Sequence, residues 1–258
     1  MSAIEPIMKS KDFRRIPFKS PILVAHQPEF LPWLGFVSKA AMGDVFVLLD
    51  SVDFRKEYFQ NRNKIRMNSE KGWQWLTVPV VRAKTHTYKI CDVCVERGRW
   101  ITKHLRAIEQ SYSKAQYFSK IYPELQAIYG YQGNNLSEFN TKFIQFAFRM
   151  FKIQVPIYRT SDMMKSGYDI NGEKTDIVIS MCQAVSARTF VAGQFGRTYL
   201  ETEKFKKLNI ELVFQSFRHP VYEQIQGGFV PNMSYIDLLF NHGPDSISIL
   251  GKSSYDQA

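Results

Sequence analysis

Apolar runs and a helical pattern alternate near the start of the chain. Residues 22–25 (ILVA) and 45–49 (VFVLL) are uninterrupted apolar runs, long enough only for buried strands. Residues 32–42 between them have the pattern of a helix, with Pro32 in the first turn, where proline is tolerated. Strand, helix and strand in this order form a βαβ unit, and its right-handed crossover makes the two strands parallel.

The same alternation returns after Pro156 and predicts a second βαβ unit in the same sheet. A last helix is expected at 235–241, with Ser234 as its N-cap and Gly243 in a left-handed turn at its end. The expected strands of this half are 157–160, 189–193 and 210–214, and its expected helices are 172–185 and 199–208.

The middle of the chain changes from a strand pattern to a helical one. Residues 73–80 and 88–95 predict strands, with Pro79 marking an edge or a strand end. Phe139, Phe143, Phe146 and Met150 recur at helical spacing. Helices are expected at 100–112, 114–129 and 136–151, the last capped by Asn134 or Asn135.

These patterns together predict an α/β protein with a mainly parallel sheet built from N- and C-terminal βαβ units. The expected domain organisation is a basic arm at 1–20, an α/β core at 21–98 and 153–250, and a helical insertion at 99–152.

Two titratable side chains stand where expected parallel strands end. His26 follows the first strand and Asp50 ends the second, so both lie at the sheet edge where open α/β sheets bind ligands. His26 would contact phosphate or act as an acid or base, and Asp50 could orient it, accept a proton or hold Mg²⁺. The alternatives are structural: His26 and Gln27 lock a turn, and Asp50 caps the next segment.

The arrangement around His26 is reminiscent of nucleotidylyltransferases with a paired-histidine motif, in which a histidine contacts phosphate. The second histidine of such a pair would fall near Phe36, which cannot donate a hydrogen bond. ATP-dependent adenylation therefore stays one alternative among several.

Further polar groups could line the same cleft. Asn61, Arg62 and Lys64 suit a diphosphate or a carboxylate, although a solvated basic loop explains them equally well. Gly193 and Arg197 lie in a GxxG turn after a strand, which resembles a phosphate cradle but is by default a tight turn. His219, in a second His-Pro turn, is expected to meet His26 above the sheet edge. The remaining binding candidates are Gln27, Trp33, Tyr222, Gln224, Asn232 and Asp237.

Charge and composition narrow the classes of partner. The formal net charge is +10, but the basic residues recur in short groups without one stripe. This distribution favours an anionic small molecule over nucleic acid. No apolar run is long enough to span a membrane, and residues 1–20 lack the apolar centre of a secretory signal. Three cysteines indicate a reducing compartment, so we expect a cytoplasmic protein.

The cysteines do not indicate a metal site. Cys91 and Cys94 resemble half of a zinc knuckle, but no second pair has suitable spacing. Cys182 is expected to be a core thiol.

Several motifs together resemble one known family. HQPEFLPWLG, VFVLLDSVDF, FQNRNKI and WLTVPV in the first third, and VAGQFGRTYL, HPVYEQ and FVPNMSYIDLLFNHG near the end, resemble the WbqC-like family of bacterial proteins. The resemblance covers most of residues 22–243 and is weaker in the middle. Members of that family occur among genes for surface polysaccharide and are described as glycine transferases acting on an amino sugar of O-antigen.

The resemblance implies an enzyme that transfers glycine to the amine of a nucleotide-linked amino sugar. His26, Asp50 and His219 would be its acid–base groups. An amide cannot form from a free carboxylate without activation, so ATP with Mg²⁺, or a preactivated donor, would be needed. Two alternatives stay open: a sugar-nucleotide-binding or scaffold protein without catalysis, and a nucleic-acid-binding accessory protein. The sequence leaves the oligomeric state open.

Overall fold

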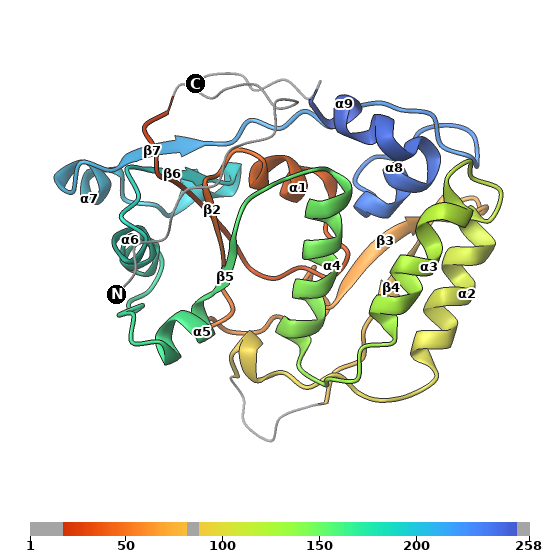
Figure 1. Cartoon of the computed structure of the whole chain (residues 1–258), viewed down its shortest axis with the longest axis horizontal. Coiled ribbons are helices and arrows are strands. Elements are labelled where there is room, and N and C mark those ends of the chain that lie inside the picture. Colours follow the sequence, from red (N-terminus) through yellow and green to blue (C-terminus); the bar gives the residue numbers. More distant parts are fainter. Residues whose placement is uncertain (1–17, 82–87, 252–258) are drawn as a thin grey trace.

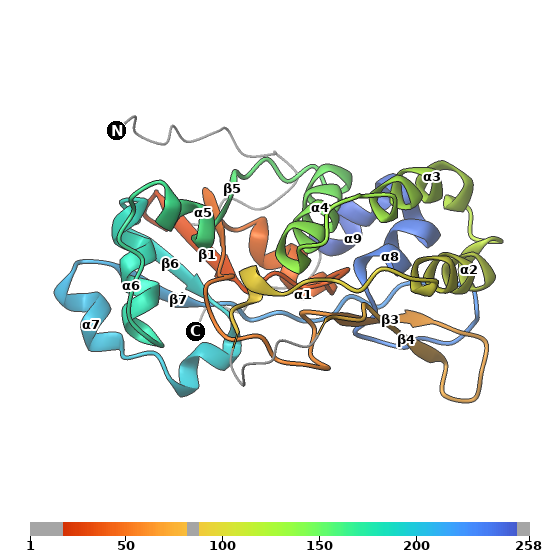
Figure 2. The same cartoon turned by 90° about the horizontal axis from the view of Figure 1, so that it is seen from below.

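The computed structural model describes residues 18–81 and 88–251. Its centre is a five-stranded sheet in the order β5-β2-β1-β6-β7, and all four strand pairs are parallel (Figure 2). This confirms the predicted α/β fold with a sheet assembled from both ends of the chain. The strands are β1 (Ile22–His26), β2 (Val45–Leu48), β5 (Ile157–Arg159), β6 (Thr189–Ala192) and β7 (Glu211–Phe214).

Helices cover both faces of this sheet, which explains why its strands are apolar without interruption. Val24 and Phe46 point into a hydrophobic core under α1 (Leu34–Ala40) and α4 (Leu136–Met150). Their chain neighbours point into a second core, because successive side chains of a strand face opposite ways. The second core lies under α5 (Thr160–Lys165), α6 (Thr175–Ala184) and α7 (Thr202–Lys207) (Figure 1).

An antiparallel hairpin lies beside the sheet and beneath the remaining helices. It consists of β3 (Arg62–Arg66) and β4 (Trp73–Thr77), and Ile65 and Leu76 join its inner face to the first core. The remaining helices are α2 (Trp100–Tyr112), α3 (Phe118–Tyr129), α8 (Tyr235–His242) and, nearer the sheet, α9 (Ser246–Gly251). Figure 2 shows them on one side of the hairpin.

Two local expectations are wrong. The strand expected at 88–95 is a 3₁₀ turn, η1 (Ile90–Asp92), flanked by isolated bridges such as Val80↔Val95, because Ile90 and Val93 are buried by contacts with separate segments. The basic segment at 61–64 is not a solvated loop but enters β3. Further 3₁₀ turns are η2 (Gln194–Thr198) and η3 (Gly243–Asp245). The helix expected at 199–208 follows η2 and is shorter than expected, as α7 (Thr202–Lys207).

The aromatic residues of the middle segment are core residues. Phe139, Phe143 and Phe146 on α4 share one continuous hydrophobic core with Phe36 and Phe46 at the sheet. The proposed division into a core domain and a helical insertion stays a prediction, and residues 1–17 of the expected arm lie outside the described residues. Within the described part of the chain, no helix is both long and apolar enough to cross a membrane.

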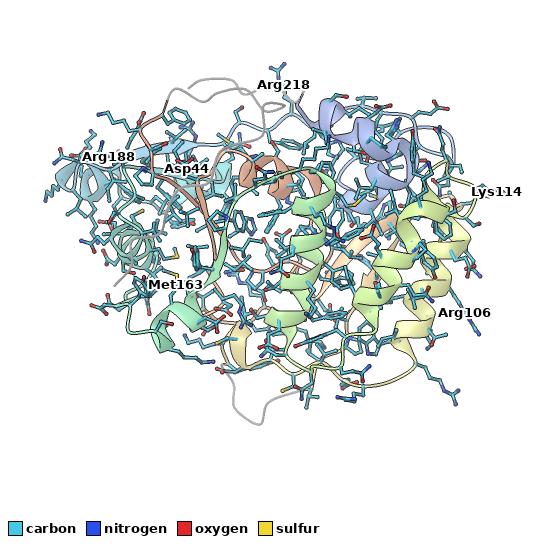
Figure 3. All side chains as sticks on the ribbon, viewed as in Figure 1. Asp44, Arg106, Lys114, Met163, Arg188 and Arg218 are labelled. Carbon is cyan, nitrogen blue, oxygen red and sulfur yellow. The ribbon has the colours of Figure 1, made fainter. Side chains whose placement is uncertain are left out.

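Basic side chains are spread over the surface, as their distribution in the sequence indicates. Arg106 on α2 and Lys114 just after it are exposed at one end of the molecule, Arg188 is exposed at the opposite end, and Arg218 is exposed on the edge between the two ends (Figure 3).

Asn135 fixes the start of α4. Its side-chain oxygen accepts from the Glu138 backbone N–H at 3.0 Å, and its Nδ2 donates to the Cys91 carbonyl at 2.6 Å. Replacing Asn135 by alanine removes both interactions and is expected to lower the free energy of unfolding by about 1–2 kcal/mol. Urea denaturation measures this loss; Asn134→Ala, one residue earlier and exposed, is the matched control, and equal losses would contradict the capping role.

His104 makes stability depend on pH. It is buried between α2 and β4, where Nε2 donates to the Thr77 carbonyl at 3.1 Å and Nδ1 accepts from the Tyr129 hydroxyl at 3.3 Å. Burial lowers the pKa of His104 to about 4, and the hydrogen bond to Thr77 opposes this shift.

The unfolded chain binds a proton at His104 near pH 6.5, whereas the folded chain binds it only near pH 4. We therefore expect the free energy of unfolding to fall by up to about 3 kcal/mol as the pH is lowered through this window. His104→Gln should have a shallower dependence in urea titrations between pH 6.5 and 4. An unchanged slope would contradict the assignment.

Candidate active site at the carboxyl edge of the sheet

The strand order places a topological switch point between β1 and β6. From β1 the chain moves outward to β2 and β5, and it then returns to β6 and β7 on the other side of β1. The loops that leave the carboxyl ends of β1 and β6 therefore diverge. Open α/β sheets bind ligands at this type of topological switch point.

His26 ends β1 at this point. Its Nδ1 lies 3.0 Å from the Gln27 carbonyl oxygen, which can only accept, so Nδ1 carries the proton and Nε2 keeps a free lone pair. Burial, reinforced by the positive charge of Lys39, lowers the pKa of His26 to about 3. The imidazole is therefore neutral at pH 7, yet 28% of its side chain is exposed, so a ligand can reach it.

The ring of Phe36 packs 4.8 Å from the ring of His26. Phe36 is the residue that stands where a paired-histidine motif would place its second histidine. The structure thus brings this position to His26, but with a side chain that cannot hold a phosphate.

Two buried ionisable groups complete the cluster. Glu29 and Lys39 are each only 4% exposed, and Glu29 Oε1 lies 3.7 Å from His26 Nδ1. Lys39 Nζ donates to the Ala25 carbonyl at 3.0 Å, and it would lie 3.7 Å from a Cβ atom added at Gly193, the first residue after β6. Lys39 therefore lies close to the ends of both strands.

Burial shifts both groups toward their uncharged forms. It raises the pKa of Glu29 to about 8, against the opposing charge of Lys39, and it lowers the pKa of Lys39 to about 8, against the opposing charge of Glu29. At pH 7 the carboxyl is mostly protonated and the amine mostly cationic. The switch point then holds a buried positive charge, a protonated acid whose Oε2 has no hydrogen-bond partner among the described residues, and a neutral base.

Asp50 does not join this cluster, contrary to its expected role beside His26. Its two carboxylate oxygens accept four hydrogen bonds of 2.7–3.0 Å from the Ser137 hydroxyl, the Thr160 hydroxyl, and the Ser161 hydroxyl and backbone N–H. The side chain is fully buried. Asp50 thus ties the end of β2 to α4 and α5, and the carboxylate beside His26 is that of Glu29.

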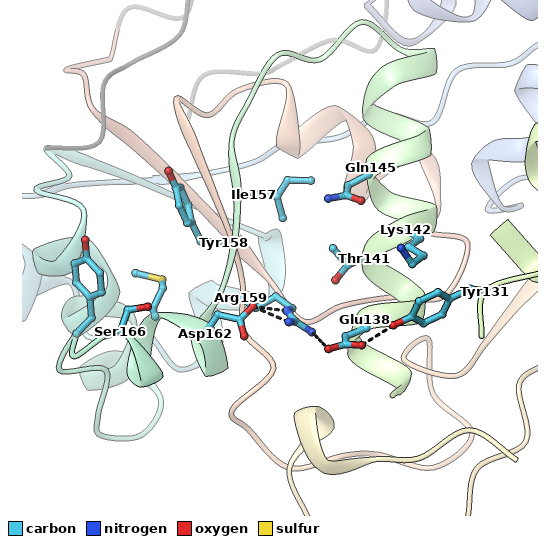
Figure 4. Close-up of a pocket in the computed structure, with 12 residues that line it drawn as sticks. Tyr131, Glu138, Thr141, Lys142, Gln145, Ile157, Tyr158, Arg159, Asp162 and Ser166 are labelled. Carbon is cyan, nitrogen blue, oxygen red and sulfur yellow. Dashed lines mark hydrogen bonds and ion pairs between the residues drawn. The ribbon is translucent and has the colours of Figure 1, made fainter. Parts of the chain in front are cut away.

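A cavity of about 440 Å³ opens between the edge strand β5 and α4 (Figure 4). At its base the Arg159 guanidinium donates to Asp162 at 2.7 Å and lies 3.4 Å from Glu138, which accepts from the Tyr131 hydroxyl at 2.6 Å. Two acidic side chains, Glu138 and Asp162, and two basic ones, Arg159 and Lys142, balance each other in the lining. The rest of the lining consists of aromatic, amide and hydroxyl side chains and two apolar ones: Tyr131, Thr141, Gln145, Tyr158, Ser166, Tyr168, Ile157 and Met163.

The second His-Pro turn forms a separate cluster. His219 donates through Nδ1 to the Pro220 carbonyl at 2.8 Å, and its ring contacts Phe217, Tyr222 and Phe229. Its Nε2 is buried without a partner, and burial lowers its pKa. In the described residues no hydrogen bond, ion pair or ring contact joins His219 to His26, so the expected meeting of the two histidines is not observed.

Beside His219, Asp237 is completely buried and is not a surface residue of α8. Its carboxylate accepts from Tyr112, Tyr222 and Gln224 at 2.7–2.9 Å, and burial raises its pKa. The structure therefore brings three of the predicted residues together, as a buried network that fixes α8.

Among the other predicted residues that the structure describes, Gln27 is bonded to His26 through its carbonyl and Gly193 lies near Lys39, whereas the rest share no hydrogen bond, ion pair or ring contact with His26. Gln27 Oε1 accepts from Gln60 Nε2 at 2.7 Å and orders the loop after β1. The buried Asn61 amide donates to the Val78 carbonyl at 3.0 Å. Trp33 packs edge-on against Phe217, Arg197 lies over the Phe214 ring, Asn232 is exposed with φ 61°, and Arg62 and Lys64 lie on the hairpin.

Glu29 and Lys39 are the candidates that sequence reasoning missed. The available signal was Lys39 as the only charged residue of the apolar helix 34–40, all of which is buried. Cys182 is buried, as expected, and burial raises the pKa of Cys91 to about 11. Among residues 18–81 and 88–251 no three His, Cys, Asp or Glu side chains are grouped to hold a metal ion.

Fold and site together define an α/β protein with a parallel sheet covered on both faces and a cluster of ionisable side chains at its switch point. A sequence profile of the WbqC-like protein family matches residues 27–249, and the chain belongs to this family. It is 31% identical over 223 residues to the uncharacterized protein Rv1507c of Mycobacterium tuberculosis, which covers 85% of this chain and 93% of that protein. No solved structure matches the chain.

Proposed function

We propose that this protein transfers an amino acid, with glycine as the expected donor, to the amine of a nucleotide-linked amino sugar in surface-polysaccharide assembly. The observation that carries the proposal is the buried cluster of His26, Glu29 and Lys39 at the switch point. The proposal places the reaction in the cytoplasm, where nucleotide-linked sugars would be the acceptors.

The cluster contains the groups that aminoacyl transfer requires. The amine nitrogen attacks the acyl carbon, a C–N bond forms, and the bond from that carbon to its leaving group breaks. His26 Nε2 would accept the proton that the amine loses, and protonated Glu29 would give its proton to the leaving group. Lys39 would hold the diphosphate of the nucleotide sugar through the one buried positive charge.

The acyl donor must arrive activated, because a free carboxylate does not form an amide with an amine. ATP or a preactivated amino acid is therefore a second substrate in this proposal. The described residues provide the cation Lys39 for its phosphates.

The cavity between β5 and α4 is where we place the sugar ring of the acceptor. β5 lies two strands from β1, about 10 Å at ordinary strand spacing, so one extended ligand can reach both places. Balanced charges, tyrosine rings and amide groups suit a neutral, hydroxyl-rich ring better than a second anion.

Lys142 on α4 tests this placement. Lys142→Ala removes a donor from the cavity without disturbing a helix, because alanine is the best helix former. It should weaken binding of a UDP-linked amino sugar by about tenfold in calorimetric titration. Lys120→Ala, on the exposed surface of α3, should leave the affinity unchanged. Equal affinities of all three proteins would contradict the placement.

The function itself is tested by incubating the purified protein with ATP, Mg²⁺, glycine and a UDP- or dTDP-linked amino sugar. The proposal predicts a glycyl amide by mass spectrometry, together with AMP or phosphate release. Binding of the sugar nucleotide without product would instead support the non-catalytic alternative. Steeply salt-dependent binding to arbitrary DNA, with no sugar-nucleotide binding, would support the nucleic-acid alternative.

A further inference from the structure

One face of the hairpin is turned away from the helices, and its side chains are half-buried: Trp75 contacts the ring of Phe59, and Arg66 at the end of β3 donates to the Gly227 carbonyl at 2.7 Å. Ile65 and Leu76 point to the helices, and the alternation of strand side chains turns Arg62, Lys64 and the two tryptophans Trp73 and Trp75 the other way. Neither tryptophan belongs to a hydrophobic core of the protein. In Figure 2 this face is the underside of β3 and β4, with α2, α3 and α8 above it.

Cations and indole rings alternate on this face. Arg62 lies 4.4 Å from the ring centroid of Trp75, Lys64 lies 4.5 Å from Trp73 and 5.4 Å from Trp75, and Lys71 lies 4.0 Å from Trp73. Lys64 is directly opposite Trp75 in the strand register. The rings hold the cations in place. Arg62 is also paired with Glu57 at 3.7 Å, whereas no acidic side chain of the described residues pairs with Lys64 or Lys71, whose ammonium groups can therefore bind anions.

The surroundings are basic and amphipathic. Residues 55–77 contain six basic and two acidic side chains. Tyr58 is 45% exposed and Met67, in the turn of the hairpin, is 39% exposed. A surface that combines Trp, Tyr and an exposed methionine with Lys and Arg is typical of proteins that lie in the headgroup layer of an acidic membrane.

We propose that the outer face of the β3–β4 hairpin docks the protein on a membrane surface that contains anionic phospholipid. Each indole already has two cations within 5.4 Å of its ring centroid, so a base or a sugar ring would have to displace them in order to stack. Phosphate headgroups need no ring face, because they bind the cations directly.

Charge repulsion disfavours docking of another segment of this chain, or of a second copy of it, on this face of the hairpin. The residues before 18 are themselves basic, and a second copy would bring another net charge of +10. The proposal is independent of the proposed chemistry at His26, since the hairpin residues are not part of that cluster.

Vesicle sedimentation of the full-length protein tests the docking. Vesicles of phosphatidylcholine with phosphatidylglycerol should bind it at low salt, and pure phosphatidylcholine vesicles should not. Each basic group near an acidic surface contributes about fivefold in affinity, so Lys64→Glu with Lys71→Glu should lower binding by at least about twentyfold. Lys206→Glu with Lys207→Glu, on exposed α7, changes the net charge equally and should cost far less.

Tryptophan fluorescence supplies a second readout that leaves the charges in place. Vesicles should shift the emission of the wild type to shorter wavelength, and Trp73→Phe with Trp75→Phe should abolish most of that shift. Equal losses for the two charge-reversal pairs, or an emission that vesicles do not shift, would overturn the proposal. Tighter binding of poly(dT) than of vesicles, lost in Lys64→Glu with Lys71→Glu, would overturn it as well.

Discussion

Glu29→Gln is expected to lower the rate of amide formation by about 10²- to 10⁴-fold, the usual contribution of a positioned proton donor. Glutamine has the shape of the protonated carboxyl but cannot give up a proton to the leaving group. The Oε2 atom of Glu29 has no partner to lose, so the fold should remain intact. The wild-type kcat should fall above about pH 8, as Glu29 loses its proton, and the variant should lack that decline.

Steady-state assays of purified wild type and variant from pH 6 to 9.5 measure both effects. Glu57→Gln is the matched control, because Glu57 is 61% exposed in the loop before β3. A Glu29→Gln enzyme with wild-type kcat would remove Glu29 from the mechanism. A melting temperature of the variant so low that part of the protein is unfolded in the assay would explain the lost activity by unfolding, and the role of Glu29 would then be structural.

Asp50→Ala should be among the most destabilising substitutions in the protein. It removes the acceptor of four hydrogen bonds and leaves buried donors on Ser137, Thr160 and Ser161 unpaired. We expect a loss of about 3–5 kcal/mol in the free energy of unfolding, as for other broken buried polar pairs.

Urea denaturation distinguishes this structural role from a catalytic one. Asp162→Ala removes a carboxylate that is 49% exposed, and it should cost less than about 1 kcal/mol. An Asp50→Ala protein of wild-type stability but without activity would restore Asp50 to the catalytic machinery and would contradict its assignment here.

The parallel sheet could be predicted because its strands carry their own signal. Residues 22–25 and 45–48 are apolar on every position, and only a strand covered on both faces requires that pattern. The cap of α4 at Asn135 and the cap of α8 at Ser234 follow from local side-chain chemistry in the same way. Short-range patterns were sufficient for these elements.

The hairpin strand β3 gave no such signal. Its sequence RNKIR contains only one apolar residue, Ile65. The other inward-facing position is Asn63, whose amide donates to the Phe30 and Leu31 carbonyls, so the strand lacks an apolar alternation. Residues 88–95 gave a false strand signal, since Ile90 and Val93 are both buried but lie in and after a 3₁₀ turn, where their backbones bond Val52 and Leu136 and form no ladder. Contacts with distant parts of the chain determine the secondary structure of both segments.

The position of the candidate site at the end of β1 could be predicted, but the residues that accompany His26 could not. His26 at the end of β1 follows from topology, and so does its position at the switch point. The identity of the carboxylate beside His26 does not follow from topology, because the hydrogen-bond partners of Asp50 lie 87–111 residues further along the chain. Glu29 resembles an ordinary loop charge in the sequence, and Lys39 differs from a surface lysine only by its apolar helix, so the packed fold was needed to show that both are buried beside His26.

Calorimetric titration of wild type and Lys39→Met with a UDP-linked amino sugar tests the central claim most directly. Methionine matches the length of lysine without its charge, and replacing a buried charge by an apolar side chain of similar size is often tolerated. The account predicts binding by the wild type that weakens above about pH 8, and at least tenfold weaker binding by a folded Lys39→Met protein. Equal affinities at pH 7 would show that the cluster at the ends of β1 and β6 does not hold the anionic substrate.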